Sequence, residues 1–318
     1  MTLDVLTFGE AMLRLSPPSG VPLNRATNLD VNVAGAEANV AVALSLLGRS
    51  VAWISRLPDN DLGRRVARDL AATGVDISHV RWEDSGRLGT YFVDHGAGPK
   101  GVSVIYDRQG SAAAAISPDD LPTRAMAESR LIHLTGITPA LSRSCREASE
   151  AAANAARDSE SLLSVDINYR AKLWSTGDAR RILEGVAAGA DLVVCTAEDA
   201  RDVFGIEGDP AEVAESLADR LGSADTVVTN GAEGAVCWHD ADVIGVEATP
   251  TDIVDRLGAG DAFTAGVIDG LLDGDVGKGL RRGSVLAAMA LATRGDQVSV
   301  TRPELAQMLG PGGRRLDR

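Results

Sequence analysis

The sequence predicts an α/β fold: a three-layer α/β/α sandwich with a mainly parallel central sheet and a small β-sheet lid. Three observations predict it. Short β-branched apolar runs alternate with longer helical patterns, as is typical of βαβ units. The last third of the chain is helical in pattern, and two separated segments interrupt the alternation.

The alternating elements follow one another in chain order. VLTFG near the N-terminus predicts a first strand, and VAWIS at 51–55 predicts a strand before a helix at about 62–72. The remaining elements are a strand at 131–135, a helix at about 143–157, strands at 162–168, 191–195 and 225–229, and helices at 261–272 and 279–293. Open sheets of this kind bind ligands beyond the carboxyl ends of their strands, so residues that follow the strands are the candidate site residues.

Two segments lack this alternation and predict the lid. Residues 12–33 carry three prolines and no helical pattern, whereas residues 88–116 contain GTYFVD and VSVIYDRQ, which predict antiparallel strands. We expect both segments to form one small sheet over the strand ends. Because no linker or internal repeat divides the chain, residues 1–318 are expected to form a single domain.

The composition excludes several classes of protein. Hydrophobic residues make up 45% of the 318 residues and charged residues 24%, which are ordinary globular values. No apolar run approaches the roughly 20 residues that span a bilayer, so we expect no membrane association. The N-terminus lacks the basic stretch of a signal peptide, and three scattered cysteines fit neither a zinc site nor a disulfide framework. We therefore expect a cytoplasmic protein.

The chain is strongly acidic. A net charge of −14 and a pI near 4.7 argue against nucleic-acid binding, which requires a basic surface. Only three of the 31 basic residues are lysines. This composition is typical of proteins from a halophilic, high-salt cytoplasm and also of proteins from GC-rich genomes. Comparing the stability of the protein in molar KCl and without salt separates these two origins.

One stretch near the C-terminus indicates chemistry. In VDRLGAGDAF, Gly258 and Gly260 permit close approach of the backbone to a ligand, and a helix follows. Free N–H groups and the positive dipole end at a helix start bind anions such as a phosphoryl group. Asp261 is placed to accept a proton from an attacking hydroxyl. A turn with a capping carboxylate would give the same local pattern, and the lysine of a nucleotide P-loop is absent.

Two motifs together resemble a known family. DRLGAGDAF (255–263) is similar to the C-terminal signature of the ribokinase-like (PfkB) carbohydrate kinases, and VAGAEANVAVALSLLG (33–48) resembles their first signature. The likeness extends from Phe8 to about Arg302. It implies the ribokinase-like form of the predicted fold, ATP and Mg²⁺ as cofactors, and phosphoryl transfer to an alcohol group. The catalytic residues that it implies are Asp261 as general base and Gly258, Ala259 and Gly260 as the anion-binding loop.

Three further stretches resemble the 2-keto-3-deoxygluconate kinases within this family. They are YDRQGSAAAAI (106–116), HLTGITPALS (133–142) and VDINYRAKLW (165–174). A sugar acid requires a cation for its carboxylate, and arginine offers a planar fork for two oxygens. The substrate-binding residues that the resemblance implies are Gly35, Asn39, Tyr91, Tyr106, Arg108, Arg170, Asp261 and Asp296.

The nucleotide site is implied by the same resemblance. VVTNGAEGAV (227–236) is similar to the family's strand and glycine turn on the ATP side, although a plain β-turn would explain NGAEG equally well. The implied ATP-binding residues are Asn168, Tyr169, Thr229, Gly231, Ala232, Gly234, Gly258 and Gly260.

Two positions depart from the family pattern. In the stretch that matches the family's Asn-x-x-Glu motif, Thr196 replaces asparagine and Asp199 replaces glutamate. Asp199 is the candidate magnesium ligand, directly or through water, because magnesium often keeps several of its waters. Asp255 matches the first residue of a monovalent-cation site, but Leu257 replaces the usual hydroxyl residue. A potassium requirement therefore stays open.

The expected function is ATP-dependent phosphorylation of 2-keto-3-deoxygluconate to 2-keto-3-deoxy-6-phosphogluconate in Entner–Doudoroff-type catabolism. Two alternatives remain: a ribokinase-like kinase for a neutral sugar such as fructose or ribose, and a non-catalytic sugar-acid sensor. The sequence does not distinguish the gluconate-derived acid from its galactonate epimer. Because a lid with an exposed sheet edge favours pairing of subunits, we also expect a homo-oligomer.

Overall fold

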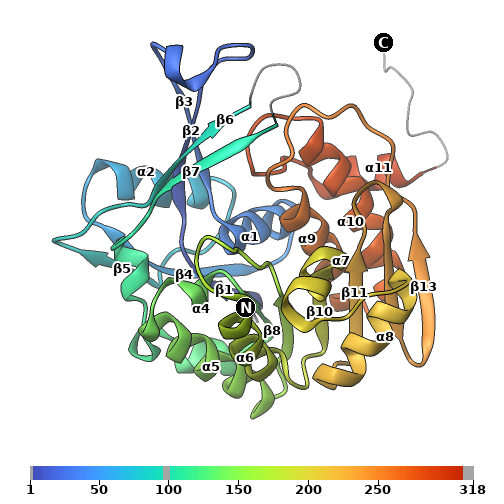
Figure 1. Cartoon of the computed structure of the whole chain (residues 1–318). Coiled ribbons are helices and arrows are strands. Elements are labelled where there is room, and N and C mark those ends of the chain that lie inside the picture. Colours follow the sequence, from blue (N-terminus) through green and yellow to red (C-terminus); the bar gives the residue numbers. More distant parts are fainter. Residues whose placement is uncertain (1–2, 96–100, 311–318) are drawn as a thin grey trace.

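Figure 1 shows the computed structural model of the chain, which describes residues 3–95 and 101–310. Its central sheet has nine strands in the order β13-β12-β11-β10-β9-β8-β1-β4-β5. Their bounds are β1 (Leu3–Phe8), β4 (Val51–Pro58), β5 (Val80–Glu83), β8 (Ser129–Thr135), β9 (Leu162–Asp166), β10 (Leu192–Thr196), β11 (Asp225–Thr229), β12 (Ala235–His239) and β13 (Asp242–Val246). The strands from β5 to β11 are parallel, which confirms the mainly parallel sheet, and β12 and β13 add an antiparallel edge.

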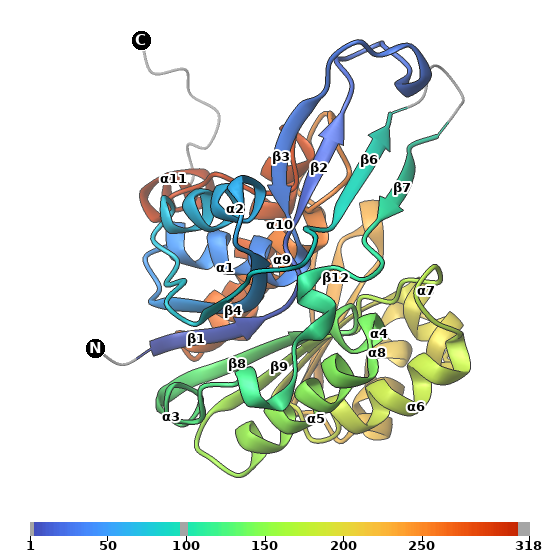
Figure 2. The same cartoon turned by 90° about the vertical axis from the view of Figure 1, so that its left-hand side faces the viewer.

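Helices cover both faces of this sheet, as Figure 2 shows. One face carries α1 (Ala36–Leu46), α2 (Asp61–Ala71), α9 (Ala259–Leu272), α10 (Val276–Leu291) and α11 (Arg302–Leu309). The other carries α3 (Thr123–Glu128), α4 (Thr138–Leu141), α5 (Arg143–Arg157), α6 (Thr176–Ala187) and α8 (Pro210–Leu221). Each group of helices packs an apolar core against the sheet, so the predicted three layers are present. No helix in the described ranges is long and apolar enough to cross a bilayer.

The helix that begins at the GAGD stretch is almost completely buried. Eleven of its fourteen residues are buried, and it packs closely against α10. Gly266 of α9 lies against the backbone of Gly283 in α10, where an added Cβ would collide with it. This close backbone approach on one side, with α1 on another, fixes the direction of α9 relative to the sheet.

A second sheet of four strands stands over the carboxyl ends of the central strands and extends away from the body in Figure 2. Its order is β3-β2-β6-β7, with β2 (Met12–Ser16), β3 (Asp30–Ala34), β6 (Thr90–Asp94) and β7 (Ser103–Asp107). The two pairs β2–β3 and β6–β7 are antiparallel, and β2 joins β6 in parallel. The small lid sheet predicted from two separated segments is therefore present; residues 96–100 of the second segment lie outside the described residues.

Candidate active site

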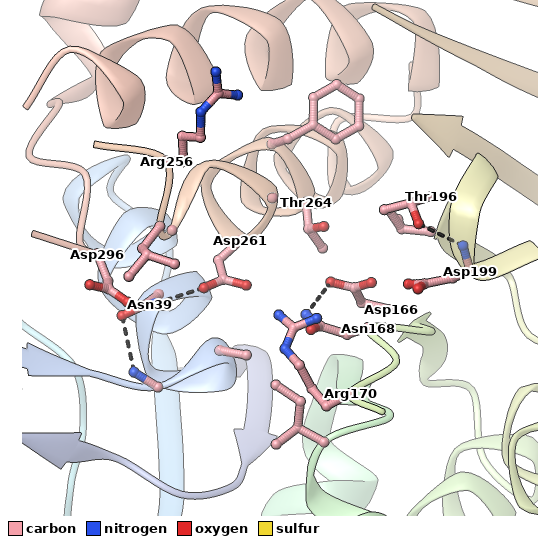
Figure 3. A pocket seen from close by; sticks show the side chains of 18 of the residues that line it. Asn39, Asp166, Asn168, Arg170, Thr196, Asp199, Arg256, Asp261, Thr264 and Asp296 are labelled. Atoms are coloured by element: carbon pink, nitrogen blue, oxygen red, sulfur yellow. Dashed lines mark hydrogen bonds between the residues drawn. The ribbon is translucent and has the colours of Figure 1, made fainter. Parts of the chain in front are cut away.

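A cavity of about 230 Å³ opens between the lid and the carboxyl ends of the central strands. Figure 3 shows side chains from several elements converging on it. Its lining comes from the lid, the start of α1, the ends of β9, β10 and β11, and the start of α9. The acidic residues that line it are Glu10, Asp166, Asp199, Asp261 and Asp296, and the basic ones are Arg108, Arg170 and Arg256.

The start of α9 presents free backbone donors to this cavity. Gly258 is the N-cap residue with φ of +83°, and an added Cβ would collide with the carbonyl oxygen of Asp296, so glycine is required there. No side chain caps this helix, whereas Asn60 caps α2 and Ser142 caps α5. The first N–H groups of α9 are therefore available to an anion, together with the positive end of the helix dipole.

Asp261 lies in the first turn of α9 and does not cap it. Its carboxylate accepts a hydrogen bond of 2.7 Å from the amide nitrogen of Asn39, which projects from α1. Burial raises the pKa of Asp261 to about 7, although the hydrogen bond from Asn39 and the charge of Arg170 act in the opposite direction. A carboxylate that is half protonated near neutral pH and faces a cavity fits the role of a general base.

Two more carboxylates face Asp261 from neighbouring strand ends. Asp166 ends β9, and burial together with the charge of Asp261 raises its pKa to about 7. Asp199 follows β10, where Thr196 caps the short helix α7 (Ala197–Asp199); burial also raises its pKa. Asn168 donates to Asp166 at 2.9 Å, and its buried Oδ1 has no hydrogen-bond partner among the described residues.

The arginines predicted to bind the substrate differ in their partners. Arg170 is exposed at the cavity, and the hydrogen bond that it donates goes to the backbone oxygen of Tyr169 at 3.0 Å. The charge of Arg170 opposes the rise in pKa that burial causes at Asp166, Asp199 and Asp261. Its guanidinium forms no ion pair within 4 Å in the described part of the chain. Arg108, by contrast, is paired with the buried carboxylate of Glu10.

A buried arginine that the motifs did not indicate ties the lid to the loops around α9. Arg14 of β2 is only 1% exposed; it forms ion pairs with Asp296 at 2.6 Å and with Asp255. The hydroxyl of Tyr91, on β6, donates to the other oxygen of Asp296 at 2.6 Å. The Asp255 carboxylate, predicted from the resemblance as half of a monovalent-cation site, therefore already faces a guanidinium. Asp296 lines the cavity but is engaged by Arg14 and Tyr91.

A second cavity of about 510 Å³ adjoins the first on the α10 side. Thr229, Arg256, Gly260 and Phe263 line both cavities. The second is mostly apolar, with Val246, Ala248, Ile253, Ala287 and Leu291 among its lining residues. Among the described residues it has no acidic lining, and its basic lining is Arg256 alone.

The structure places the predicted residues in three groups. The first cavity is lined by Gly35, Asn39, Tyr91, Tyr106, Arg108, Asn168, Arg170, Asp199, Thr229, Gly258, Gly260, Asp261 and Asp296. The second is lined by Thr229, Gly231, Ala232, Gly234, Ala259 and Gly260. Tyr169 lines neither cavity, and its hydroxyl donates to the backbone oxygen of Trp174 at 3.1 Å.

Sequence reasoning missed Glu10, Arg14 and Arg256 and left Asp166 open. Each had a weak signal: Asp166 ends a strand, and Arg14 is a lone charge in the apolar strand MLRLS. Glu10 directly follows the first strand, and Arg256 precedes GAGD within the motif itself. These signals were too weak to predict site residues, because charged residues at such positions are usually solvated.

The donor set beside Asp261 fits a hydrated magnesium ion. Asp166 and Asp199 supply carboxylate oxygens, and the unpartnered Oδ1 of Asn168 is a third hard oxygen donor in the same cavity. Magnesium is commonly held by one or two carboxylates plus waters and phosphates. Within residues 3–95 and 101–310, no group of three or more histidine, cysteine or acidic side chains is arranged to hold a metal ion by itself.

Known proteins match this chain over nearly its whole length. The model of the pfkB family carbohydrate kinases matches residues 2–303. A 2-dehydro-3-deoxygalactonokinase of Haloferax volcanii is 39% identical over 100% of both chains. A 2-dehydro-3-deoxygluconokinase of Thermoproteus tenax is 31% identical, covering 96% of this chain and 94% of its own length.

Solved structures share the same architecture. The crystal structure of a 2-dehydro-3-deoxygluconokinase from Thermotoga maritima superposes with a TM-score of 0.90 at 28% identity, covering 96% of this chain and 98% of that one. A PfkB protein from Polaromonas superposes with a TM-score of 0.85 at 36% identity, covering 96% and 99% of the two chains.

Proposed function

The chain belongs to the PfkB family of carbohydrate kinases, and we propose that it transfers the γ-phosphate of ATP to the terminal hydroxyl of a 2-keto-3-deoxy sugar acid. The observation that carries the proposal is that Asp261 and Arg170 line the same cavity without forming an ion pair with each other. Asp261 is a buried carboxylate with a raised pKa, and Arg170 is an exposed cation with no ion-pair partner in the described residues. The first suits a general base and the second suits a substrate carboxylate.

Asp261 acts on the hydroxyl that attacks. One of its oxygens is held by Asn39, which leaves the other to accept the hydroxyl proton. The hydroxyl oxygen forms a bond to the γ-phosphorus as the bond from that phosphorus to the bridging oxygen breaks. The electron pair leaves with ADP, and the proton goes to the Asp261 carboxylate, so the products are ADP and the 6-phosphorylated sugar acid.

The start of α9 stabilises the charge that develops on the phosphoryl oxygens. Its N–H groups after Gly258 have no capping side chain, so they are oriented toward the anion before reaction. Asp166, Asp199 and Asn168 would hold Mg²⁺, which when bound neutralises phosphate charge. The second cavity, largely apolar, would take the adenine and ribose between β13 and α10.

The sugar side of the site is built on the lid, on α1 and on the loop after β9. Arg170 binds the substrate carboxylate, and Arg108 adds a second guanidinium held in place by Glu10. Tyr91 and Tyr106 lie on the neighbouring strands β6 and β7, with ring centroids 5.6 Å apart, and present one aromatic wall to the sugar. An added Cβ at Gly35 would collide with the backbone of Glu10, so glycine is required where the start of α1 packs against that backbone at the edge of the cavity.

The relatives leave the epimer open. The relative at 39% identity is named for the galactonate-derived acid, and those at 31% and 30% are named for the gluconate-derived acid. We propose that one of these two acids is the substrate; the sequence motifs resemble those of the kinases for the gluconate-derived acid but do not distinguish the two epimers. The predicted homo-oligomer also stays a proposal: β7 is an edge strand of the lid and its Ile105 is 55% exposed. Light scattering after gel filtration checks it.

The test is ADP release with Mg-ATP at low and at molar KCl. The acceptors are 2-keto-3-deoxygluconate, its galactonate epimer, fructose and ribose. Turnover confined to the two keto acids is expected, and their ratio identifies the epimer. Preference for a neutral sugar would overturn the carboxylate role of Arg170 but leave Asp261 as the base. Tight binding of a keto acid without any ADP release would favour the sensor alternative.

A further inference from the structure

Arg256 is the residue through which the two cavities meet. It lies between the buried Asp255 and the GAGD loop, and its side chain is exposed. It lines the first cavity beside Gly258 and Asp261 and also lines the second beside Ile253 and Ala259. In Figure 3 its side chain points away from Asp261, on the side opposite Arg170.

Its guanidinium has no protein partner in the described residues. No hydrogen bond or ion pair joins Arg256 to another residue there, whereas its neighbour Asp255 is bound by Arg14 and by the backbone N–H of Leu257. Of the other cations at the first cavity, Arg108 is paired with Glu10, and Arg170 lies on the far side of Asp261. Arg256 is therefore a free cation at the boundary between the cavities.

The charges of the two cavities make a cation at this place favourable for a bound polyphosphate. The first cavity already contains five acidic side chains, and the second has no acidic and one basic side chain among the described residues. A polyphosphate that passes from the second cavity to Asp261 brings several negative charges into this field. A planar guanidinium binds two phosphate oxygens at once and is less strongly hydrated than an ammonium group.

We propose that Arg256 grips the polyphosphate of the nucleotide where it crosses from the second cavity into the first, and that it stabilises the negative charge left on the departing β-phosphate. This inference rests on the proposed function, because it takes the second cavity as the nucleoside site. Arg256 makes the affinity for the nucleotide depend on its phosphates rather than on its base.

The experiment compares calorimetric binding of ADP and of adenosine to the full chain in three variants. Arg256→Met keeps the apolar stem and removes the charge, Arg256→Lys restores a charge without the fork, and Arg281→Met is the matched control. Arg281 is an exposed arginine of α10 that lines neither cavity. We expect Arg256→Met to weaken ADP binding about 10- to 100-fold and to leave adenosine binding unchanged. Arg256→Lys should recover part of the loss.

The outcomes separate this inference from the proposed function. If the unaltered protein binds ADP more tightly than adenosine and Arg256→Met does so equally well, the role of Arg256 is wrong and the kinase proposal stands. Equal weakening in Arg281→Met would also overturn it, because the effect would then come from net charge. If the unaltered protein binds neither ligand, the second cavity is not a nucleotide site and both proposals fail.

Discussion

The two cavities that meet at the start of α9 differ in charge. Five acidic and three basic side chains line the first, under the lid, whereas the second is lined mainly by apolar residues, glycines and hydroxyl side chains, with Arg256 as its charged residue among the described ones. In the first cavity burial raises the pKa values of Asp166 and Asp261 to about 7. The second cavity has no acidic side chain among the described residues that line it.

This difference indicates a division of labour. Ionised carboxylates that are kept from water cost folding free energy, and proteins tolerate such a cost mainly at sites that use it. An apolar cavity, in contrast, binds an uncharged base without keeping an ionised group away from water. The first cavity should therefore be sensitive to single changes in charge, and the second mainly to changes in shape.

The largest effect is expected for Asp261→Asn. The change keeps the size of the side chain and removes the base, so kcat should fall about 10²- to 10⁴-fold. Steady-state kinetics measure this, and calorimetry with ADP serves as the control, since nucleotide binding should persist. Activity within a few-fold of the unaltered protein would show that Asp261 is not the base.

Arg14 and Arg170 allow the stability effect of a buried, paired arginine to be compared with that of an exposed, unpaired one. Arg14→Met leaves two buried carboxylates, Asp255 and Asp296, without their cation, and should destabilise the protein by about 3–5 kcal/mol. Arg170→Met removes an exposed charge and should change the free energy of unfolding by less than about 0.5 kcal/mol. Urea denaturation compares the two. Similar losses in both variants would contradict the distinction between a paired and a free arginine.

Arg170→Met should instead weaken binding of the sugar acid. The KM for the acid should rise about 10- to 100-fold while the KM for ATP stays nearly constant, because one charge-assisted contact is lost on the sugar side alone. Arg108→Met should act in the same direction and in addition leave the buried Glu10 unpaired. A parallel rise in both KM values for Arg170→Met would remove its assignment to the carboxylate.

The pH dependence of kcat/KM tests the raised pKa of Asp261. The base must be ionised, so kcat/KM should rise about tenfold per pH unit below a pKa of about 7 and level off above it. The charge of Asp261 also raises the pKa of Asp166, so Asp166→Asn tests the interaction between the two carboxylates. Removing that charge should lower the apparent pKa of the profile. A flat profile from pH 5 to 8 in the unaltered protein would contradict the assignment.

Patterns of short range predicted most of the fold. The helix expected at about 143–157 is α5 with those bounds, because Ser142 supplies a cap directly before it. The helix expected from Asp261 begins two residues earlier, at Ala259, since Gly258 in a left-handed conformation is its N-cap. The antiparallel edge formed by β12 and β13 was not predicted, because its alternation is weak and the turn that joins the two strands, formed by Asp240 and Ala241, has positive φ values without a glycine to signal it.

The candidate site was predicted only where a motif lies within a few residues. Asp261 and its glycines are such a case. The link from Arg14 to Asp255 and Asp296 joins residues 241 and 282 positions apart, and a single sequence carries no sign of such pairing. Likewise, nothing local distinguishes Arg170, which is free, from Arg108, which Glu10 binds, because only the fold brings Glu10 to the lid.

A crystal structure of the protein with ADP and a 2-keto-3-deoxy sugar acid tests the division between the cavities most directly. We expect the adenine in the second cavity beside Ile253 and Ala287, the phosphates along Arg256 to the start of α9, and the terminal hydroxyl of the acid beside Asp261. The carboxylate should contact Arg170. A nucleotide base under the lid, or a carboxylate bound away from both Arg170 and Arg108, would contradict it.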